Sequence, residues 1–540
     1  MSSRRNFVFW LNDLAQCVTG IHKTKHTELV DVVFTYDWNA KDENELSAYI
    51  NFLVHLNSAH GHTFIKKTFE NVVSKFKPPS ETEDKKKTEP KKDTSDPKDP
   101  SSRFTYLHLL IRKLVSNIPD ACGQLSSVII NHFPHKSFPL PIHEAFITNL
   151  LKIIDYCPFL REKLIHVIID RIIQIDVEIK PKEIPDEEEN VVEKEKENED
   201  IGVFELEKEE DKIKEELKMQ HTENAGKLDQ IINILILYIQ SCPDKDEIFK
   251  ILMTVFEQTI LTTHQSKYTQ FIIFYICQMK YNYVQNFVFK VLLEKVVNPS
   301  CPLTIRQAAT AYLASFIGRA KFVQTHVVRD VLITLSKEIN QYIDTHSDQH
   351  PDCEKHGLFY LMVQSLFYII LFKHTTLEEM PASKQFFEDL ELSRIVGCSL
   401  NPLKLIMPDI VKEFAWICSK LDVLDCRPII QHNKHVILPT KSTFGGPNSL
   451  ESFFPFDPCL LKLTRSHISE HYITWDALLE TSPYNDSNDN DDNEPHYREP
   501  APYASSYEDS AASMSIGGSF DVMNYVVQDY GSSFGDNVWT

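Results

Sequence analysis

The stretch 305–323, Ile-Arg-Gln-Ala-Ala-Thr-Ala-Tyr-Leu-Ala-Ser-Phe-Ile-Gly-Arg-Ala-Lys-Phe-Val, constrains the fold more than any other part of the chain. Its apolar residues recur at the spacing of one buried helical face. Ile305, Arg306, Ala309 and Leu313 fit the inner-helix pattern of a HEAT-type repeat, in which the small alanine lets a neighbouring helix approach closely. The pattern predicts a stacked-helix solenoid, a fold used mainly to present long surfaces to other macromolecules.

Composition agrees with an all-α fold in a reducing compartment. Only 14 glycines occur in 540 residues, which disfavours β-barrels, sandwiches and glycine-rich nucleotide loops. Eleven cysteines without a repeating spacing are expected to be free thiols in the nucleus or cytosol. The longest apolar run, 358–372, is too short to span a bilayer and is interrupted by polar residues. It predicts a buried core helix, and we expect no membrane contact.

More than half of the net negative charge is concentrated in one segment of the chain. The chain carries a net charge of −21, and residues 183–216 contain 17 acidic and 5 basic residues, a net of −12. Such a segment cannot bury enough apolar surface to fold. We predict six regimes: N-terminal solenoid helices in 1–77, a disordered charged linker in 78–100, helical repeats in 101–182, an acidic disordered loop in 183–225, helical repeats in 226–480 and a disordered acidic tail in 481–540.

Within these regimes, helices are expected over 45–56, 63–76, 104–115, 146–154 and 160–173, where apolar residues recur three and four positions apart. The lysines at 85–87 and 91–92 fit either a nuclear-import signal or a solvated run of charge.

Motifs for chemistry are missing from the sequence. There is no nucleotide-binding glycine loop, no nucleophile elbow and no complete set of zinc ligands at a matching spacing. The carboxylates of 183–216 belong to a predicted mobile segment, where no pair can be held in catalytic geometry. We therefore expect a protein that is not an enzyme and that needs no metal or cofactor.

Two groups of residues are candidates for binding a partner. Ser116, Ser126 and Ser127 lie at predicted helix ends or on a polar helix face, where phosphorylation would add negative charge and repel an acidic partner; most serines at such places are simple caps. The second group could form a basic patch that contacts DNA phosphates, or could instead pair with carboxylates and cap helices inside the fold, which we favour. Its members are Arg306, Arg319, Lys321 and Arg329.

Several segments, read together, resemble the RNA polymerase I-specific transcription initiation factor family, also called TIF-IA. Their order and spacing across roughly 45–480 carry the resemblance, and the motif Leu-Glu-Ser-Phe-Phe-Pro-Phe-Asp-Pro is the most distinctive because helix periodicity alone does not produce it. The segments are 131–136, 149–158, 160–161, 175–179, 305–323, 401–404, 408–414 and 450–458.

The resemblance implies a HEAT-repeat solenoid with an acidic loop and a non-enzymatic role in the nucleus and nucleolus. Family members bind RNA polymerase I near its stalk, keep it monomeric and competent for initiation, and bridge it to the promoter-bound selectivity factor on ribosomal DNA. Phosphorylation of serines regulates that contact. We expect the polymerase contact around 116–136, including His135 and Lys136. A weak DNA contact and a homodimer remain open, and the alternative is a HEAT-repeat adaptor of another pathway, such as transport or chromosome scaffolding.

Overall fold

The computed structural model describes residues 2–36, 38, 43–78, 101–179, 207–264, 266–439, 442, 450 and 453–475; for 2–6, 101–103 and 207–222 it describes the backbone alone. The chain divides into two compact units, Met1–Pro495 and His496–Thr540, and the second lies wholly outside the described residues. In the described part of the first unit, all regular elements are helices, and a single isolated antiparallel bridge joins Ala320 to Tyr472.

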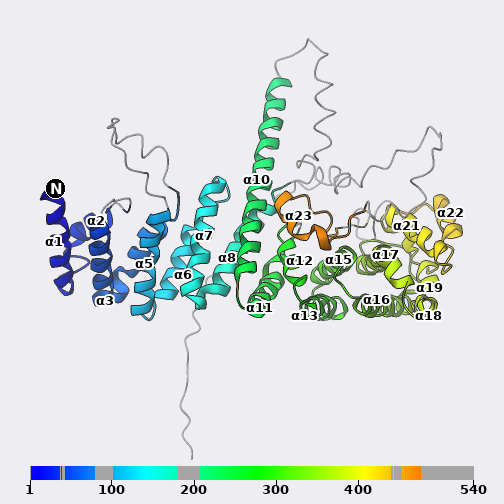
Figure 1. Ribbon diagram of the computed structural model, residues 1–540. Coiled ribbons are helices and arrows are strands. Elements are labelled where there is room, and N and C mark those ends of the chain that lie inside the picture. The colour runs from blue at the N-terminus through cyan, green and yellow to red at the C-terminus, as the bar shows by residue number, and fades with distance from the viewer. Residues whose placement is uncertain are drawn as a thin grey trace, which may run out of the picture. The chain divides into compact units, whose positions relative to one another are not determined.

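The helices of the amino-terminal half follow one another along the chain (Figure 1). Most carry an apolar face, and prolines or short 3-10 turns separate them. They are α1 (Ser2–Gln16), α2 (Thr27–Phe34), α3 (Glu43–Val73), α5 (Ser101–Asn117), α6 (Ala121–His132), α7 (Leu140–Tyr156), the 3-10 turn η2 (Pro158–Leu160), α8 (Arg161–Asp176) and α10 (Glu207–Ser241).

The carboxy-terminal half continues the series with two π-helical segments, η5 (Phe256–Ile260) and η6 (Asn286–Leu293). The α-helices are α11 (Lys245–Val255), α12 (Phe271–Cys277), α13 (Tyr281–Gln285), α14 (Glu294–Val297), α15 (Leu303–Arg319), α16 (Thr325–His346), α17 (Gly357–Glu378), α18 (Ser383–Asp389), α19 (Leu392–Val396), α20 (Pro402–Leu405), α21 (Pro408–Lys420), α22 (Arg427–His435) and α23 (Lys462–Ile468).

Contacts between these helices are mostly local, as expected of a solenoid. Helix α3 packs against α1, α5 and α6; α7 and α8 pack against each other and against α10; α17 packs against α15, α16 and α21. Each helix hides its apolar face against neighbours that are close in sequence, so the core runs along the array instead of forming one central cluster. The predicted all-α, HEAT-like helical-repeat solenoid is confirmed.

Helices α15 and α17 form the tightest part of this core. Ala309 and Leu313 are fully buried, as the repeat pattern predicts. Gly318 allows the closest approach, because a Cβ atom built there would lie 2.5 Å from Cε1 of Tyr368. Helix α17 is apolar and long enough to cross a membrane by composition, yet 89% of its most hydrophobic window is buried inside the fold. The run 358–372 is therefore a core helix, as predicted.

One segment breaks the local pattern by returning to helices far away in sequence. Residues 453–475, which we call the return segment, contain α23, and α23 packs against α10 and α12 (Figure 1). Asp229 of α10 accepts hydrogen bonds from the backbone N–H groups of Leu463 and Thr464, both at 2.8 Å. The carboxylate thus caps the first turn of α23, which otherwise has unsatisfied donors.

The two helices expected over 45–56 and 63–76 both form: they share the label α3 and lie on either side of a kink at His60, whose backbone is non-helical. One local prediction needs correction. Helix α10 begins at Glu207, inside the segment expected to be disordered up to 225. Its start, Glu-Lys-Glu-Glu-Asp-Lys-Ile-Lys-Glu-Glu-Leu-Lys, consists largely of good helix formers with opposite charges three and four positions apart, and these favour a helix even without burial. The linker 79–100, its lysine runs, residues 180–206 and the tail 481–540 lie outside the described residues.

Candidate partner-binding surface

Two adjoining hollows lie between α6 and α8, next to the segment expected to bind a partner. The first has a volume of about 290 Å³ and the second about 340 Å³, and Ile130 and Arg171 belong to both. We call their lining the α6–α8 surface. It comprises Ile130, Asn131, Phe133, Pro134, His135, Lys136, His143, Lys163, His166, Val167, Asp170, Arg171 and Gln174.

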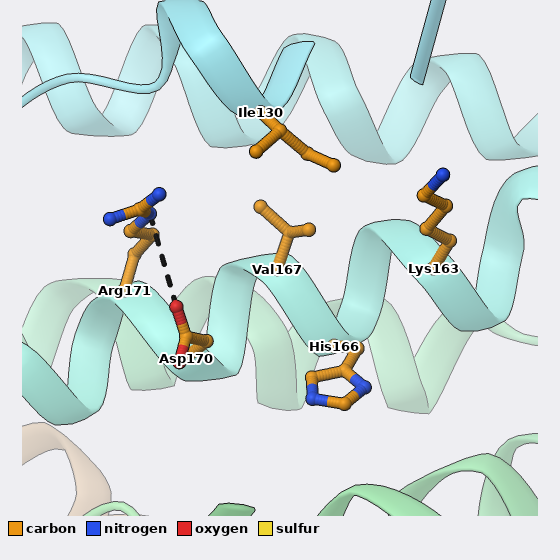
Figure 2. A pocket seen from close by; sticks show the side chains of 6 residues that line it. All are labelled: Ile130, Lys163, His166, Val167, Asp170 and Arg171. Atoms are coloured by element: carbon orange, nitrogen blue, oxygen red, sulfur yellow. Dashed lines mark ion pairs between the residues drawn. The ribbon is translucent and has the colours of Figure 1, made fainter. Parts of the chain in front are cut away.

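The first hollow has an apolar floor and a charged rim. Figure 2 shows Ile130 and Val167 pointing toward one another, with Lys163 on one side and Arg171 on the other. His166 points away from them, and its Nε2 lies 2.9 Å from Oγ1 of Thr259. This arrangement follows from the periodicity of α8, because residues 163, 167 and 170–171 lie on the same face of the helix.

The surface is basic although the protein is acidic. Its lining carries three basic side chains, Lys136, Lys163 and Arg171, against one acidic side chain, Asp170. Asp170 lies 4.0 Å from Nε of Arg171, and the two side chains are 48% and 36% exposed, so the pair is weak and solvated. An acidic segment of a partner could therefore compete for Arg171 at little cost.

The loop that follows α6, residues 133–136, is held by side chains from two other helices. Nε2 of His143 on α7 lies 3.1 Å from the carbonyl oxygen of His135, and Nζ of Lys227 on α10 donates to the carbonyl oxygen of Lys136 at 2.9 Å. Burial, and secondarily the charge of Lys227, lowers the pKa of His143 to about 4. The imidazole is therefore neutral at physiological pH. The two contacts to backbone carbonyl oxygens hold the loop in this conformation. Its His135 is exposed, and Lys136 is half-buried beside Glu178, with which it forms an ion pair.

The three candidate serines differ in access. Ser116 and Ser127 are exposed, and their hydroxyls donate to carbonyl oxygens one turn back, at 2.8 Å and 3.1 Å. Ser126 is only 1% exposed; its hydroxyl donates to the carbonyl oxygen of Gly123 and accepts from Nζ of Lys163 at 3.0 Å. A kinase cannot reach Ser126 in this arrangement, so its expected place on an accessible surface is corrected. The sequence shows a polar serine pair but not which member faces inward.

The four cations that were weighed as a basic patch or as groups paired inside the fold lie in different environments. Arg319 is 1% exposed and forms a buried ion pair with Asp457. Burial lowers the pKa of Arg319, but the charge of Asp457 raises it, and the pKa lies above its ordinary value. Arg306 is half-buried, and its Nε donates to the carbonyl oxygen of Val296 at 2.9 Å, the turn-capping role of a HEAT arginine. Only Lys321 and Arg329 are exposed, and Arg329 pairs with its neighbour Asp330 at 3.0 Å.

Within the described part of the distinctive motif, residues 454–456 are buried in the core. Phe454 is 3% exposed and stacks on Tyr368, with ring centroids 4.2 Å apart. The hydroxyl of Tyr368 donates to Oδ2 of Asp457 at 3.0 Å. Phe456 is fully buried, and its ring packs against those of Phe271, Phe274, Tyr312 and Phe316.

The sequence did not single out Ile130, Lys163 or Arg171. The available signal was that residues 163, 167 and 171 recur four apart on the helix predicted over 160–173, leaving two cations on its less apolar face. That signal is weak, because solvated faces of many helices look the same. Within the described residues, no group of three or more His, Cys, Asp or Glu side chains could hold a metal ion.

Comparison with known proteins gives one consistent result. A family model described as "RNA polymerase I specific transcription initiation factor RRN3" matches residues 1–480. A mouse protein, "RNA polymerase I-specific transcription initiation factor RRN3", is 28% identical over 495 residues, covering 86% of this chain and 75% of that protein. A protein of the same description from Schizosaccharomyces pombe is 26% identical, covering 84% and 77%.

A solved structure resembles the fold as well. It is titled "Crystal Structure of RNA Polymerase I Transcription Initiation Factor Rrn3" and matches with a TM-score of 0.68 at 23% identity, covering 88% of this chain and 90% of that one. At this identity the likeness supports the fold, and the family assignment depends on the sequence matches.

Proposed function

Because the chain belongs to the family of RNA polymerase I-specific transcription initiation factors named RRN3, we propose that it binds RNA polymerase I through the α6–α8 surface. The chain is a transcription initiation factor of polymerase I, and this role places it in the nucleus. Binding needs shape and charge rather than reacting groups, and we infer that the protein has no catalytic activity of its own.

The chemistry of the surface supports an acidic polymerase segment as the occupant. Lys163 and Arg171 flank an apolar floor, so a segment with one apolar side chain between carboxylates would match both features. Ser127 is exposed one turn before Ile130, and Ser116 is exposed at the end of α5. A phosphate on Ser127 would add negative charge one turn from Ile130, and a phosphate on Ser116 would add it at the end of the preceding helix; we expect either to weaken the binding of an acidic partner.

Further parts of the proposal concern other partners. The polymerase contact would involve its stalk, and a separate part of the solenoid would meet the selectivity factor bound at the ribosomal DNA promoter; the protein would then act in the nucleolus. Lys321 and Arg329 are exposed on the carboxy-terminal half, and they support a contact with DNA phosphates or with that factor. A homodimer would have to leave the α6–α8 surface open when polymerase binds.

The observation that carries the proposal is a basic, partly apolar surface on an acidic protein, formed by the end of the segment 116–136 together with α8. The test is a pull-down from nuclear extract with the full chain, probing the largest subunits of polymerases I, II and III. We expect selective recovery of polymerase I; equal recovery of all three polymerases, or of none, would refute the proposal.

Charge-reversal variants locate the contact. Lys163→Glu with Arg171→Glu should reduce recovery of polymerase I at least tenfold and weaken its dependence on salt, because two attractive charges become repulsive. Lys384→Glu is the matched control, since Lys384 is also an exposed cation on a helix but lies on α18. Ser116→Asp and Ser127→Asp should each reduce recovery, whereas Ser393→Asp on α19 should not. Equal recovery with the charge-reversal pair and the control would place the contact elsewhere.

A further inference from the structure

Two free thiols meet beside the α6–α8 surface. The Sγ atoms of Cys122 and Cys157 lie 3.2 Å apart, whereas a disulfide bond is about 2.05 Å long. Cys122 lies in the first turn of α6, and Cys157 lies between the end of α7 and η2. The two residues are 35 positions apart in sequence and belong to different helices, so the fold and not the chain brings them together.

The two thiols differ in access. Cys122 is partly exposed, whereas Cys157 is only 2% exposed. Burial, together with its hydrogen bond to Cys122, raises the pKa of the Cys157 thiol to about 12. A small oxidant in solution therefore reaches Cys122 first, and Cys157 stays protected as a neutral thiol in contact with it.

We propose that Cys122 and Cys157 are a redox-sensitive pair, which a peroxide converts into a reversible disulfide between α6 and the α7–α8 turn. In the first step the sulfur of Cys122 attacks one peroxide oxygen, the O–O bond breaks, and a sulfenic acid and one water form. In the second step the sulfur of Cys157 attacks that of Cys122, the S–O bond breaks, and the departing hydroxide takes the proton of Cys157 to leave as a second water. The two thiols are oxidised by two electrons, which the peroxide receives. A thiol reductant reverses the reaction.

The disulfide would act close to the α6–α8 surface. Ser126 lies one turn after Cys122 on α6 and is held by Lys163 of α8, which belongs to that surface. A covalent link between the start of α6 and the turn before α8 would therefore restrict both helices that form the surface. The chemical readouts below do not require polymerase, so they are independent of the proposed function.

A second close pair of thiols provides an internal comparison. Cys418 on α21 and Cys426, which precedes α22, are hydrogen-bonded to each other but are 2% and 1% exposed. The thiols are therefore close together in both pairs, but only the first pair has a member, Cys122, that an oxidant in solution can reach. Cys17 is exposed and reports how much peroxide has reacted.

The experiment treats the full reduced chain with increasing hydrogen peroxide, blocks free thiols with an alkylating agent under denaturing conditions, and maps the peptides by mass spectrometry. We expect a peptide linked through Cys122 and Cys157 to appear at doses that leave Cys418 and Cys426 alkylated, and to disappear after dithiothreitol. Cys122→Ser should abolish it, and Cys157→Ser should leave a sulfenic acid on Cys122 that dimedone traps. Cys418→Ser is the control and should change nothing.

Two results would overturn the proposal. One is the absence of the linked peptide at doses that fully oxidise Cys17, with Cys122 either unmodified or carried directly to the sulfinic acid. The other is a link that forms equally well in protein unfolded in urea before oxidation, because the fold would then play no part. Cys122→Ser does not risk the fold, since serine is close to cysteine in size and Cys122 is partly exposed. Cys157→Ser and Cys418→Ser change buried thiols, so their circular dichroism spectra are first matched to that of the wild type.

Discussion

Replacing Asp176 should destabilise the protein more than any other single carboxylate change on α8. Asp176 is fully buried at the end of α8, where the chain leaves for the acidic segment, and it fixes the loop before α12. Its two oxygens accept hydrogen bonds from the backbone N–H groups of Lys267, Tyr268 and Thr269, at 2.9 to 3.2 Å, and from the hydroxyls of Ser266 and Thr269, at 2.9 and 2.7 Å.

The expected loss in the free energy of unfolding follows from the number and kind of these donors. A hydrogen bond to a charged group contributes about 1.5–3 kcal/mol, but contributions that share one carboxylate do not add in full. Asp176→Ala leaves three backbone donors without their acceptor in a mostly buried site, and part of the loop can relax toward water. We therefore expect a loss of about 4 kcal/mol in the free energy of unfolding. Asp176→Asn keeps the volume but turns an amide toward the same donors, so it should cost nearly as much.

The assay is urea unfolding followed by circular dichroism, together with hydrogen exchange of the loop 266–270. Local exchange is needed because a solenoid can unfold in parts, and a single midpoint then mixes several transitions. Asp170→Ala is the matched control: it lies on the same helix but is 48% exposed and only weakly paired with Arg171. If Asp176→Ala and Asp170→Ala unfolded at the same urea concentration, the assignment of Asp176 as an anchor would be wrong.

Three further predictions concern the return segment and the response to acid. Arg319→Met should cost about 3–5 kcal/mol, because it leaves Asp457 charged and buried, and thermal unfolding measures the loss. Phe456→Ala should cost about 3–5 kcal/mol by opening a cavity among four aromatic rings, whereas Phe453→Ala, at a half-buried position, should cost much less in the same urea assay. His143 has a folded-state pKa of about 4, below its unfolded value of about 6.5. The contribution of His143 to the free energy of unfolding should therefore be constant above about pH 6.5 and fall as the pH drops toward 4. His143→Gln should flatten this fall, as measured by urea midpoints at each pH.

Each of these has a clear contrary result. An Arg319→Met protein as stable as wild type would mean that the ion pair is not formed in solution. Equal losses for the two phenylalanine variants would contradict the difference in burial. An unchanged acid response in His143→Gln would assign the pH dependence to other buried histidines, such as His108, whose pKa burial also lowers.

The sequence was sufficient to predict the fold because a helix reveals its buried face through spacing. Ile305, Ala309 and Leu313 predicted both the α-helical class and the close approach of neighbouring helices, and the family resemblance was carried by short motifs. Two of those motifs turn out to contain anchors: Asp176 in 175–179 and Asp457 in 450–458. Their hydrogen-bond partners, around 266–269 and at Arg319, are far away in sequence, so no local pattern could reveal them.

The surface was harder to predict for a related reason. Whether a polar residue faces solvent depends on the helix that packs beside it, and sequence shows only its own helix. Ser126 and Ser127 are adjacent and chemically identical, yet Lys163 and the packing of α8 bury one and leave the other exposed. The sequence left both a surface role and pairing inside the fold open for Arg319, because its partner Asp457 lies in the return segment, more than one hundred residues later.

This difference between anchors and surface gives a way to separate stability from binding. Asp176, Arg319 and Phe456 hold distant segments together, so their variants should lose stability and polymerase recovery in parallel. Lys163 is exposed and Arg171 is half-buried beside a solvated partner, so charge reversal there should cost the fold less than the loss of an anchor. A variant that loses polymerase recovery with an unchanged urea midpoint therefore identifies a contact residue, and a variant that loses both identifies an anchor. The buried motifs at 175–179 and 453–458 are, by this argument, the wrong residues to mutate when the aim is to map where polymerase binds, whereas the motif at 131–136 lines the α6–α8 surface and is a suitable target.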